Sequence, residues 1–100
     1  MEHAWSKDEQ KVLRAFLDGS RIVRLPAKQK KRLVILRWLI DQIDSEKKIS
    51  ERNLNAQIAR HHPDFATIRR ELVEFRFMDR QRGVYWRTSE PVTDRRLEQD

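Results

Sequence analysis

The sequence predicts a mainly α (α+β) fold with four helices and a short C-terminal β-hairpin. Apolar residues recur at helical spacing in four segments. His61-His62-Pro63 leaves only a three-residue break between the third and fourth segments, and two short β-rich runs flank Gly83. Helix, short strand, helix, helix and hairpin is the order of a winged helix-turn-helix, so the first helix is an addition in front of that arrangement.

The first helix is predicted over residues 6–18. Ser6 and Glu9 have the spacing of a capping box, in which each side chain binds the other residue's backbone amide. Gly19 is a typical helix stop, and residues 21–25 are expected to form an extended connector. The apolar residues at helical spacing are Val12, Leu13, Phe16 and Leu17.

The second helix is predicted over residues 26–43, with Pro26 at its first position, where the missing N–H costs nothing. Beyond its first two turns, this helix is apolar around most of its circumference, which indicates that it lies between two layers as the spine of the core. Its apolar residues are Leu33, Val34, Ile35, Leu36, Trp38, Leu39, Ile40 and Ile43.

Serine and aspartate mark the starts of the last two helices. Ser50 is expected to cap a helix over 50–60, directly after a one-residue sheet bridge at Ile49. Asp64 is expected to cap the helix over 65–75. The predicted buried stripe of that helix is Phe65, Ile68, Leu72 and Phe75.

The C-terminal part is predicted to contain two strands, 77–80 and 84–87, joined by a turn around Gln81-Arg82-Gly83. Tyr85 and Trp86 point to opposite faces of the second strand, so at least one of them should be core. The expected domain organisation is one domain over 1–87 followed by a flexible polar tail over 88–100.

Composition narrows the class of protein. The chain has no cysteine, which excludes disulfides and thiolate zinc sites. Its longest aliphatic run, residues 33–36, is far shorter than the roughly 18 residues needed to span a bilayer. No signal peptide is recognisable, so we expect a cytoplasmic protein that does not enter a membrane.

The positive charge is concentrated in one stretch. Residues 21–40 contain seven Lys or Arg and no acid, whereas the whole chain carries a formal charge of +6, so the other eighty residues sum to −1. A basic helix start attracts phosphate through its cations and its free amides. Nucleic acid, most simply duplex DNA, is therefore the expected partner. The residues assigned to phosphate in this stretch are Lys28, Lys30, Lys31 and Arg32.

The alternative for this stretch is a solubilising face over a very apolar helix. The absence of acids from 19 to 40 argues against it, because solubility favours mixed signs. At 100° per residue, Lys28, Lys31 and Arg32 are expected to share a side, with Lys30 elsewhere.

The helix over 65–75 is expected to place its polar face in the major groove. Arg70 lies opposite the apolar stripe, with Thr67 beside it and Arg69 at the border. Arg70 is suited to pair with guanine, and Thr67 to contact a base edge or phosphate. The alternative is an ordinary solvated face in which Arg70 pairs with Glu74. Arg80 and Arg82, beside the hairpin turn, are expected to grip the DNA backbone.

The sequence gives little support for a catalytic site or a metal site. His61 and His62, with the distant His3, lack the spacing of a ligand set, and the chain has no glycine-rich phosphate loop. No nucleophile–base arrangement is recognisable. We therefore expect that the protein is not an enzyme and that it binds no cofactor and no metal.

Three segments resemble a bacterial family known only as domain of unknown function 2087. They are residues 25–33, 50–55 and 64–73, and the resemblance extends over about residues 12–87. Members occur alone or attached to helix-turn-helix regulators, so the resemblance implies association with transcription and supplies no active site. The family pattern leads us to expect glycine near position 76, ending a helix, where this chain has Arg76.

The leading prediction is a DNA-binding domain of bacterial transcriptional regulation. Two alternatives remain open: a protein-interaction module built on a winged-helix scaffold, and an RNA binder that prefers structured RNA over duplex DNA. The N-terminal helix is a candidate interface for a homodimer.

Overall fold

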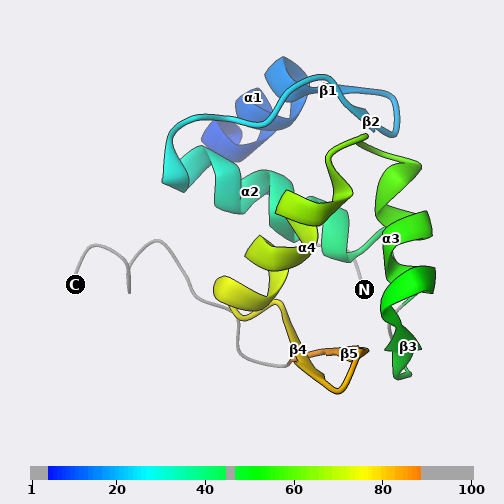
Figure 1. Cartoon of the computed structure of the whole chain (residues 1–100). Helices are drawn as coiled ribbons and strands as arrows, with labels where there is room; N and C mark the ends of the chain where they lie inside the picture. Colours follow the sequence, from blue (N-terminus) through cyan, green and yellow to red (C-terminus); the bar gives the residue numbers. More distant parts are fainter. Residues whose placement is uncertain (1–4, 45–46, 89–100) are drawn as a thin grey trace.

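The computed structural model describes residues 5–44 and 47–88, and these residues form a mixed α+β fold (Figure 1). The predicted α+β class with four helices is thus confirmed. In chain order, the elements are α1 (Lys7–Phe16), β1 (Leu17–Asp18), β2 (Arg21–Ile22), α2 (Gln29–Ile40), β3 (Ile49–Ser50), α3 (Glu51–Ala59), α4 (Phe65–Glu74), β4 (Met78–Gln81) and β5 (Val84–Arg87).

The predicted capping box begins α1. The Ser6 hydroxyl accepts a hydrogen bond from the Glu9 amide at 3.1 Å, and the Glu9 carboxylate accepts one from the Ser6 amide at 2.8 Å. Glu9 also binds Arg37 of α2 at 2.8 Å. Burial alone raises the pKa of Glu9, but the bonds from Ser6 and Arg37 outweigh it and hold the pKa below its usual 4.5. The same carboxylate therefore caps α1 and ties it to α2.

Helix α1 ends at Phe16, earlier than the predicted residue 18. Leu17 is already extended, and it pairs with Ile22 in the small β1–β2 hairpin. Gly19 supplies the turn of this hairpin at a φ of 61°, so its conformational freedom serves a strand turn rather than a helix end. The expected extended connector is partly this second strand.

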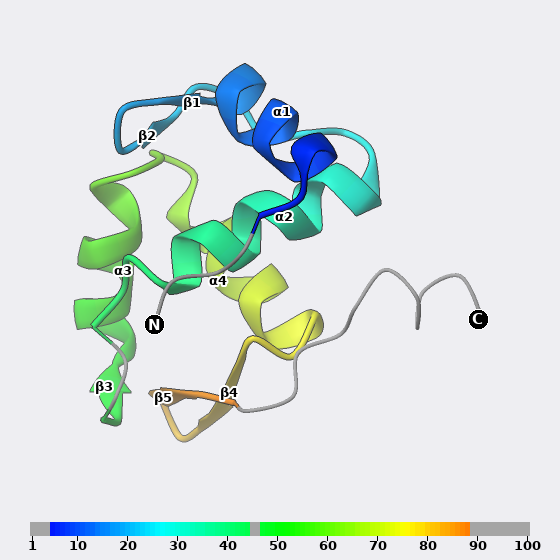
Figure 2. The same ribbon diagram turned by 180° about the vertical axis from the view of Figure 1, so that it is seen from behind.

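Helix α2 is the spine of the core, as predicted, but it is shorter than the predicted 26–43. It begins at Gln29 with Lys28 as its N-cap, and Pro26, predicted at the first helical position, is buried in the segment before it. It crosses between α1 on one side and α4 on the other (Figure 2). Six residues of α2 are buried: Leu33, Val34, Ile35, Leu36, Leu39 and Ile40.

The predicted caps of α3 and α4 are both present. The Ser50 hydroxyl accepts from the Asn53 amide at 3.1 Å, and the Asp64 carboxylate accepts from the Thr67 amide at 3.4 Å. Of the predicted α4 stripe, Ile68 and Leu72 are fully buried and Phe75 packs partly against the core. Phe65 is the exception, with 37% of its surface exposed at the first turn.

The second sheet has the strand order β3-β5-β4, all antiparallel. Ile49 pairs with Tyr85, so the predicted one-residue bridge is a two-residue strand against the second hairpin strand. Tyr85 is fully buried, whereas Trp86 is only partly buried, which confirms that one of the two is core. The turn residues Arg82 and Gly83 both have positive φ, 53° and 77°, as a tight two-residue hairpin requires.

Helix α4 ends in a left-handed residue. Arg76 follows the last helical turn with a φ of 66°, the position and conformation in which glycine is favoured. The Arg76 carbonyl accepts from the Thr88 hydroxyl, and the Thr88 amide donates to Phe77 at 3.0 Å. Thr88 therefore belongs to the folded unit, and the remainder of the predicted tail lies outside the described residues.

Each helix in the described part of the chain is too short or too polar to cross a lipid bilayer.

Candidate nucleic-acid interface

The outer face of α4 is open to solvent and carries Arg70. Ile68 and Leu72 turn inward and Arg70 is exposed, so Arg70 points away from the core. Within the described residues, the Arg70 side chain makes no hydrogen bond or ion pair, so the pairing with Glu74 considered from the sequence is not formed. Thr67 beside it is partly buried, and its amide is used by the Asp64 cap.

Arg32 is held inside the fold. Its Nε and one terminal nitrogen bind both carboxylate oxygens of Glu71, at 2.6 and 2.9 Å, and its other terminal nitrogen donates to the Pro26 carbonyl at 2.9 Å. Only 21% of the Arg32 side chain and 17% of the Glu71 side chain are exposed. The pair ties α2 to α4, and it also neutralises Glu71, which borders the outer face of α4.

Arg69 is likewise engaged by its neighbours. It donates to the Asn55 side chain at 2.6 Å and lies 3.8 Å from the Glu51 carboxylate, with 19% of its side chain exposed. These contacts join α4 to α3. Arg32 and Arg69 thus stabilise the packing of the helices. A ligand would therefore have to bind other cations of this region.

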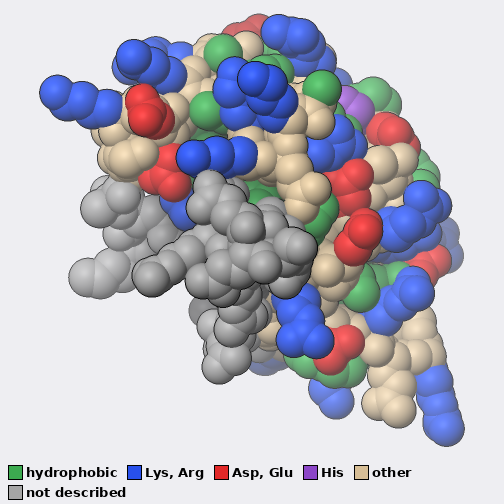
Figure 3. All heavy atoms as spheres, turned by 90° about the vertical axis from the view of Figure 1, so that its left-hand side faces the viewer, with side chains coloured by type: hydrophobic (Ala, Val, Ile, Leu, Met, Phe, Trp, Pro, Cys, Tyr) green, Lys and Arg blue, Asp and Glu red, His purple; other side chains and the backbone are tan. Residues whose placement is uncertain are grey.

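Three lysines at the start of α2 are exposed. Lys28 is the N-cap residue, which makes no side-chain cap, and Lys30 and Lys31 follow in the first turn. The structure places Lys31 and Arg32 against different elements, because Lys31 lies beside α1 whereas Arg32 lies against α4. Figure 3 shows Lys and Arg side chains predominating along the upper edge of this face, around α1 and the start of α2.

The hairpin turn presents two further arginines. Arg82 is exposed at the tip, and Arg80 is exposed on β4. Arg80 donates to the Tyr85 hydroxyl at 3.5 Å, which raises the pKa of its guanidinium. The Tyr85 hydroxyl in turn donates to Glu51 at 2.7 Å, so the hairpin is anchored to the start of α3.

The two adjacent histidines both make contacts within the fold. His61 contacts Trp38 edge to face at 5.5 Å, and its Nδ1 lies 2.5 Å from the Ser20 carbonyl. His62 accepts a hydrogen bond from the Asp64 amide at 3.0 Å. Burial, with lesser contributions from Arg21 and Arg32, lowers the pKa of His62 in spite of Asp64. Among the described residues, no three His, Asp or Glu side chains gather as metal ligands would, and His3 lies outside them.

Most of the chain matches a known protein family. Residues 21–87 match the family described as "Uncharacterized protein conserved in bacteria", domain of unknown function 2087. The chain belongs to this family. The matched region covers α2, α3, α4 and the β3-β5-β4 sheet, whereas α1 precedes it. No curated protein and no solved structure matches the chain.

The sequence prediction assigned nine residues to this interface. Arg32 and Arg69 are engaged with Glu71 and Asn55, and Thr67 is partly buried. The other six are exposed and lie on three separate elements: Lys28, Lys30, Lys31, Arg70, Arg80 and Arg82. The sequence prediction passed over two cations, Lys11 on α1 and Arg24 before α2, because neither lies in the expected helix start.

Proposed function

We propose that this family member is a winged helix-turn-helix domain that binds duplex DNA in bacterial transcriptional control. The supporting topology is α2-β3-α3-α4 followed by the β4–β5 hairpin, with β3 added beside β5. In this interpretation α4 is the recognition helix and the β4–β5 turn is the wing.

The observation that carries the proposal is the unpaired Arg70 on the solvent face of α4, flanked along the chain by free cations on α2 and on the hairpin. Arginine is the side chain best suited to read guanine in the major groove. Lysines at the start of α2 and arginines at the turn supply phosphate contacts, which position a protein without reading sequence. Glu74 is the carboxylate that stays exposed on the α4 face, since Glu71 is neutralised by Arg32.

Fluorescence anisotropy of a labelled random-sequence duplex, titrated at several salt concentrations, tests the proposal. Binding should weaken steeply as salt rises, because each phosphate contact releases counterions. Lys31→Ala should weaken binding to every duplex and lower the salt slope by about one. Lys7→Ala is the matched control, because Lys7 is exposed on α1 and lies outside the proposed surface.

Sequence reading is tested separately. After selection of a preferred site, Arg70→Ala should relax preference at one base pair, with a loss of about 1–3 kcal/mol of discrimination. Equal loss on all duplexes would remove α4 from the role of recognition helix.

A protein-interaction module is the second candidate, and the exposure of Phe65 favours it. An aromatic side chain 37% exposed at the start of α4 is suited to dock a partner protein. A folded protein with no affinity for duplex DNA at low salt would support this candidate over DNA binding. Tighter binding to structured RNA than to duplex DNA would instead identify an RNA binder.

A further inference from the structure

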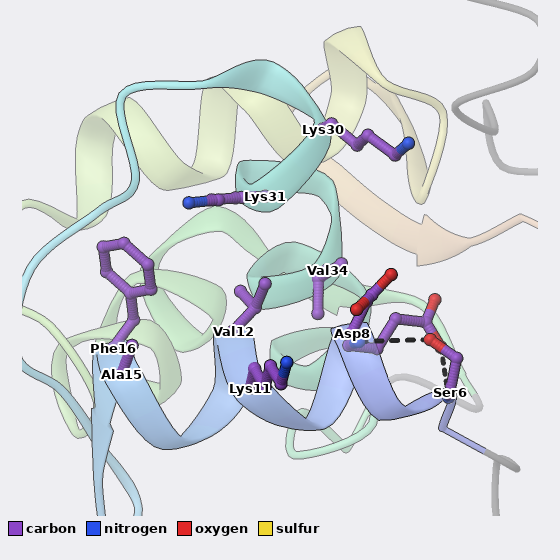
Figure 4. A pocket seen from close by; sticks show the side chains of 10 residues that line it. Ser6, Asp8, Lys11, Val12, Ala15, Phe16, Lys30, Lys31 and Val34 are labelled. Carbon is purple, nitrogen blue, oxygen red and sulfur yellow. Dashed lines mark hydrogen bonds between the residues drawn. The ribbon is translucent and has the colours of Figure 1, made fainter.

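An open groove of about 630 Å³ runs between α1 and the first half of α2 (Figure 4). Its size falls within the range of small-molecule sites, roughly 300–1,000 Å³. Residues from both helices line it: Ser6, Asp8, Glu9, Lys11, Val12, Ala15, Phe16, Lys30, Lys31 and Val34.

The middle of the groove is apolar. Val12 and Ala15 of α1 and Val34 of α2 form this part, and Figure 4 shows Val12 and Val34 on the two sides of the groove. Phe16 lies at one end, and its ring is almost completely buried. Such a surface favours the apolar body of a ligand over a purely ionic group.

Three lysines line the groove beside this apolar surface. The side chains of Lys11, Lys30 and Lys31 make no hydrogen bond or ion pair within the described residues. The amino group of Lys31 extends toward the Phe16 end (Figure 4). A further cation is present at that end, because the Arg24 guanidinium lies 4.9 Å from the centre of the Phe16 ring.

The acidic residues gather at the opposite end. Asp8 lies toward Ser6, away from Phe16 (Figure 4), and Glu9 is already bound by Arg37 at 2.8 Å. Lys31 and Arg24 therefore place positive charge at the Phe16 end of the groove and Asp8 lies at the other end, with the apolar centre between them, whereas Lys30 points away from Phe16 (Figure 4).

We propose that this groove binds a small amphiphilic carboxylate. The apolar body lies between Val12 and Val34, and the carboxylate lies at the Phe16 end, where Lys31 and Arg24 provide the opposite charge. A free inorganic anion would leave the apolar centre unused, and a neutral apolar molecule would gain nothing from the lysines. Because α1 precedes the region shared with the family, seven of the ten residues that line this site lie outside the family match. The inference does not depend on DNA binding.

Titration of the ¹⁵N-labelled protein with octanoate, followed by amide chemical shifts, tests this site. Shifts should concentrate in residues 11–16 and 30–34. Octan-1-ol and octylammonium, which keep the chain and change the head group, are the controls. Octanoate should bind at least about threefold more tightly than octanol, as expected for one exposed charge pair, and octylammonium most weakly.

Two variants locate the charge and the apolar centre. Lys31→Gln should weaken octanoate binding about threefold, whereas Lys28→Gln, at an exposed lysine that does not line the groove, should leave it unchanged. Ala15→Phe should fill the groove and reduce binding of octanoate and octanol alike. A native-like amide spectrum establishes that this variant is folded, and Lys31→Gln provides the test independently of it.

Several results would overturn the proposal. Equal affinity for octanoate and octylammonium would rule out selection by charge, and shifts confined to another surface would rule out the groove. Shifts of the groove residues on dilution without ligand would show that a second copy of the chain occupies it. Unchanged affinity in both Lys31→Gln and Ala15→Phe would also contradict the assignment.

Discussion

At the scale of single residues, whether a cation is paired within the fold or available to a ligand depends on which side chain lies opposite it. Arg32 and Lys31 are neighbours in the same basic run, yet Arg32 is bound on three sides while Lys31 is unpaired in the described structure. The partner of Arg32, Glu71, is 39 residues away in sequence. Local spacing therefore predicted that this stretch is basic, but it did not separate structural cations from available ones.

Arg76 offers a direct test of backbone strain. A non-glycine residue at a φ of 66° costs about 1 kcal/mol or more, so Arg76→Gly should raise the free energy of unfolding by about 0.5–1 kcal/mol after the entropy cost of glycine. Urea denaturation measures the change. Arg76→Ala is the control, because it removes the side chain and keeps the strain. A gain of equal size in Arg76→Ala would show that the side chain, not the backbone, is responsible.

His62 predicts a dependence of stability on pH. Its pKa is lowered from the ordinary 6.5, so the unfolded chain binds a proton more readily than the folded one. The associated stability is present above pH 6.5 and is lost as the pH falls below it. Protonation of Nδ1 would also remove the acceptor for the Asp64 amide.

Thermal unfolding across pH 5–8 measures this effect. His62→Asn, whose side-chain oxygen offers an acceptor that does not titrate, should flatten the curve in this range relative to the parent protein. A His62→Asn curve with the parent's slope would assign the pH dependence to other groups.

At the scale of elements, the starts of three helices followed from local chemistry. Ser6, Ser50 and Asp64 each cap a helix as predicted, because a cap needs only a side chain and an amide three residues away. The start of α2 did not follow. Pro26 is suited to a first helical position, but it is buried before the helix, where its carbonyl accepts a hydrogen bond from Arg32.

The Arg32–Glu71 pair joins α2 to α4, and its contribution to stability can be measured. Arg32→Gln should leave a partly buried carboxylate without its partner and lower the free energy of unfolding by about 1–2 kcal/mol. A double-mutant cycle with Glu71→Gln measures the coupling between the two side chains.

The same variant separates structure from binding. Under conditions in which Arg32→Gln is folded, its salt slope for duplex binding should match that of the parent, in contrast to Lys31→Ala. A slope lowered by about one in Arg32→Gln would return Arg32 to the set of phosphate contacts.

At the scale of the whole molecule, the sequence predicted the four helices, the strand at Ile49 and the C-terminal hairpin in their order, since these depend on periodicity and turn residues. It missed the β1–β2 hairpin, whose residues it assigned to the end of the first helix and to a connector. It did not predict the groove between α1 and α2, because that groove depends on how two helices separated by a hairpin come together. The charge distribution was visible in sequence as an acid-free stretch. Only the fold showed which of these cations join two helices, which line the groove and which lie on an open surface.

Lys30 and Lys31 belong to both proposed surfaces, so the two ligands should compete. If duplex binding and octanoate binding both occur, saturating octanoate should weaken duplex affinity a few-fold, through the loss of about one phosphate contact. Anisotropy of the labelled duplex with and without octanoate measures this effect, and octan-1-ol is the control. Undiminished duplex affinity at saturating octanoate would show that the groove and the DNA surface act independently.

The most direct test of the central claim is an amide chemical-shift map of the ¹⁵N-labelled protein with a short duplex at low salt. The account predicts shifts in residues 28–31, 66–74 and 80–83, and little change at the start of α1. Shifts confined to another face, or no shift while the protein remains folded, would contradict the proposal that α4, the start of α2 and the hairpin turn form a DNA-binding surface.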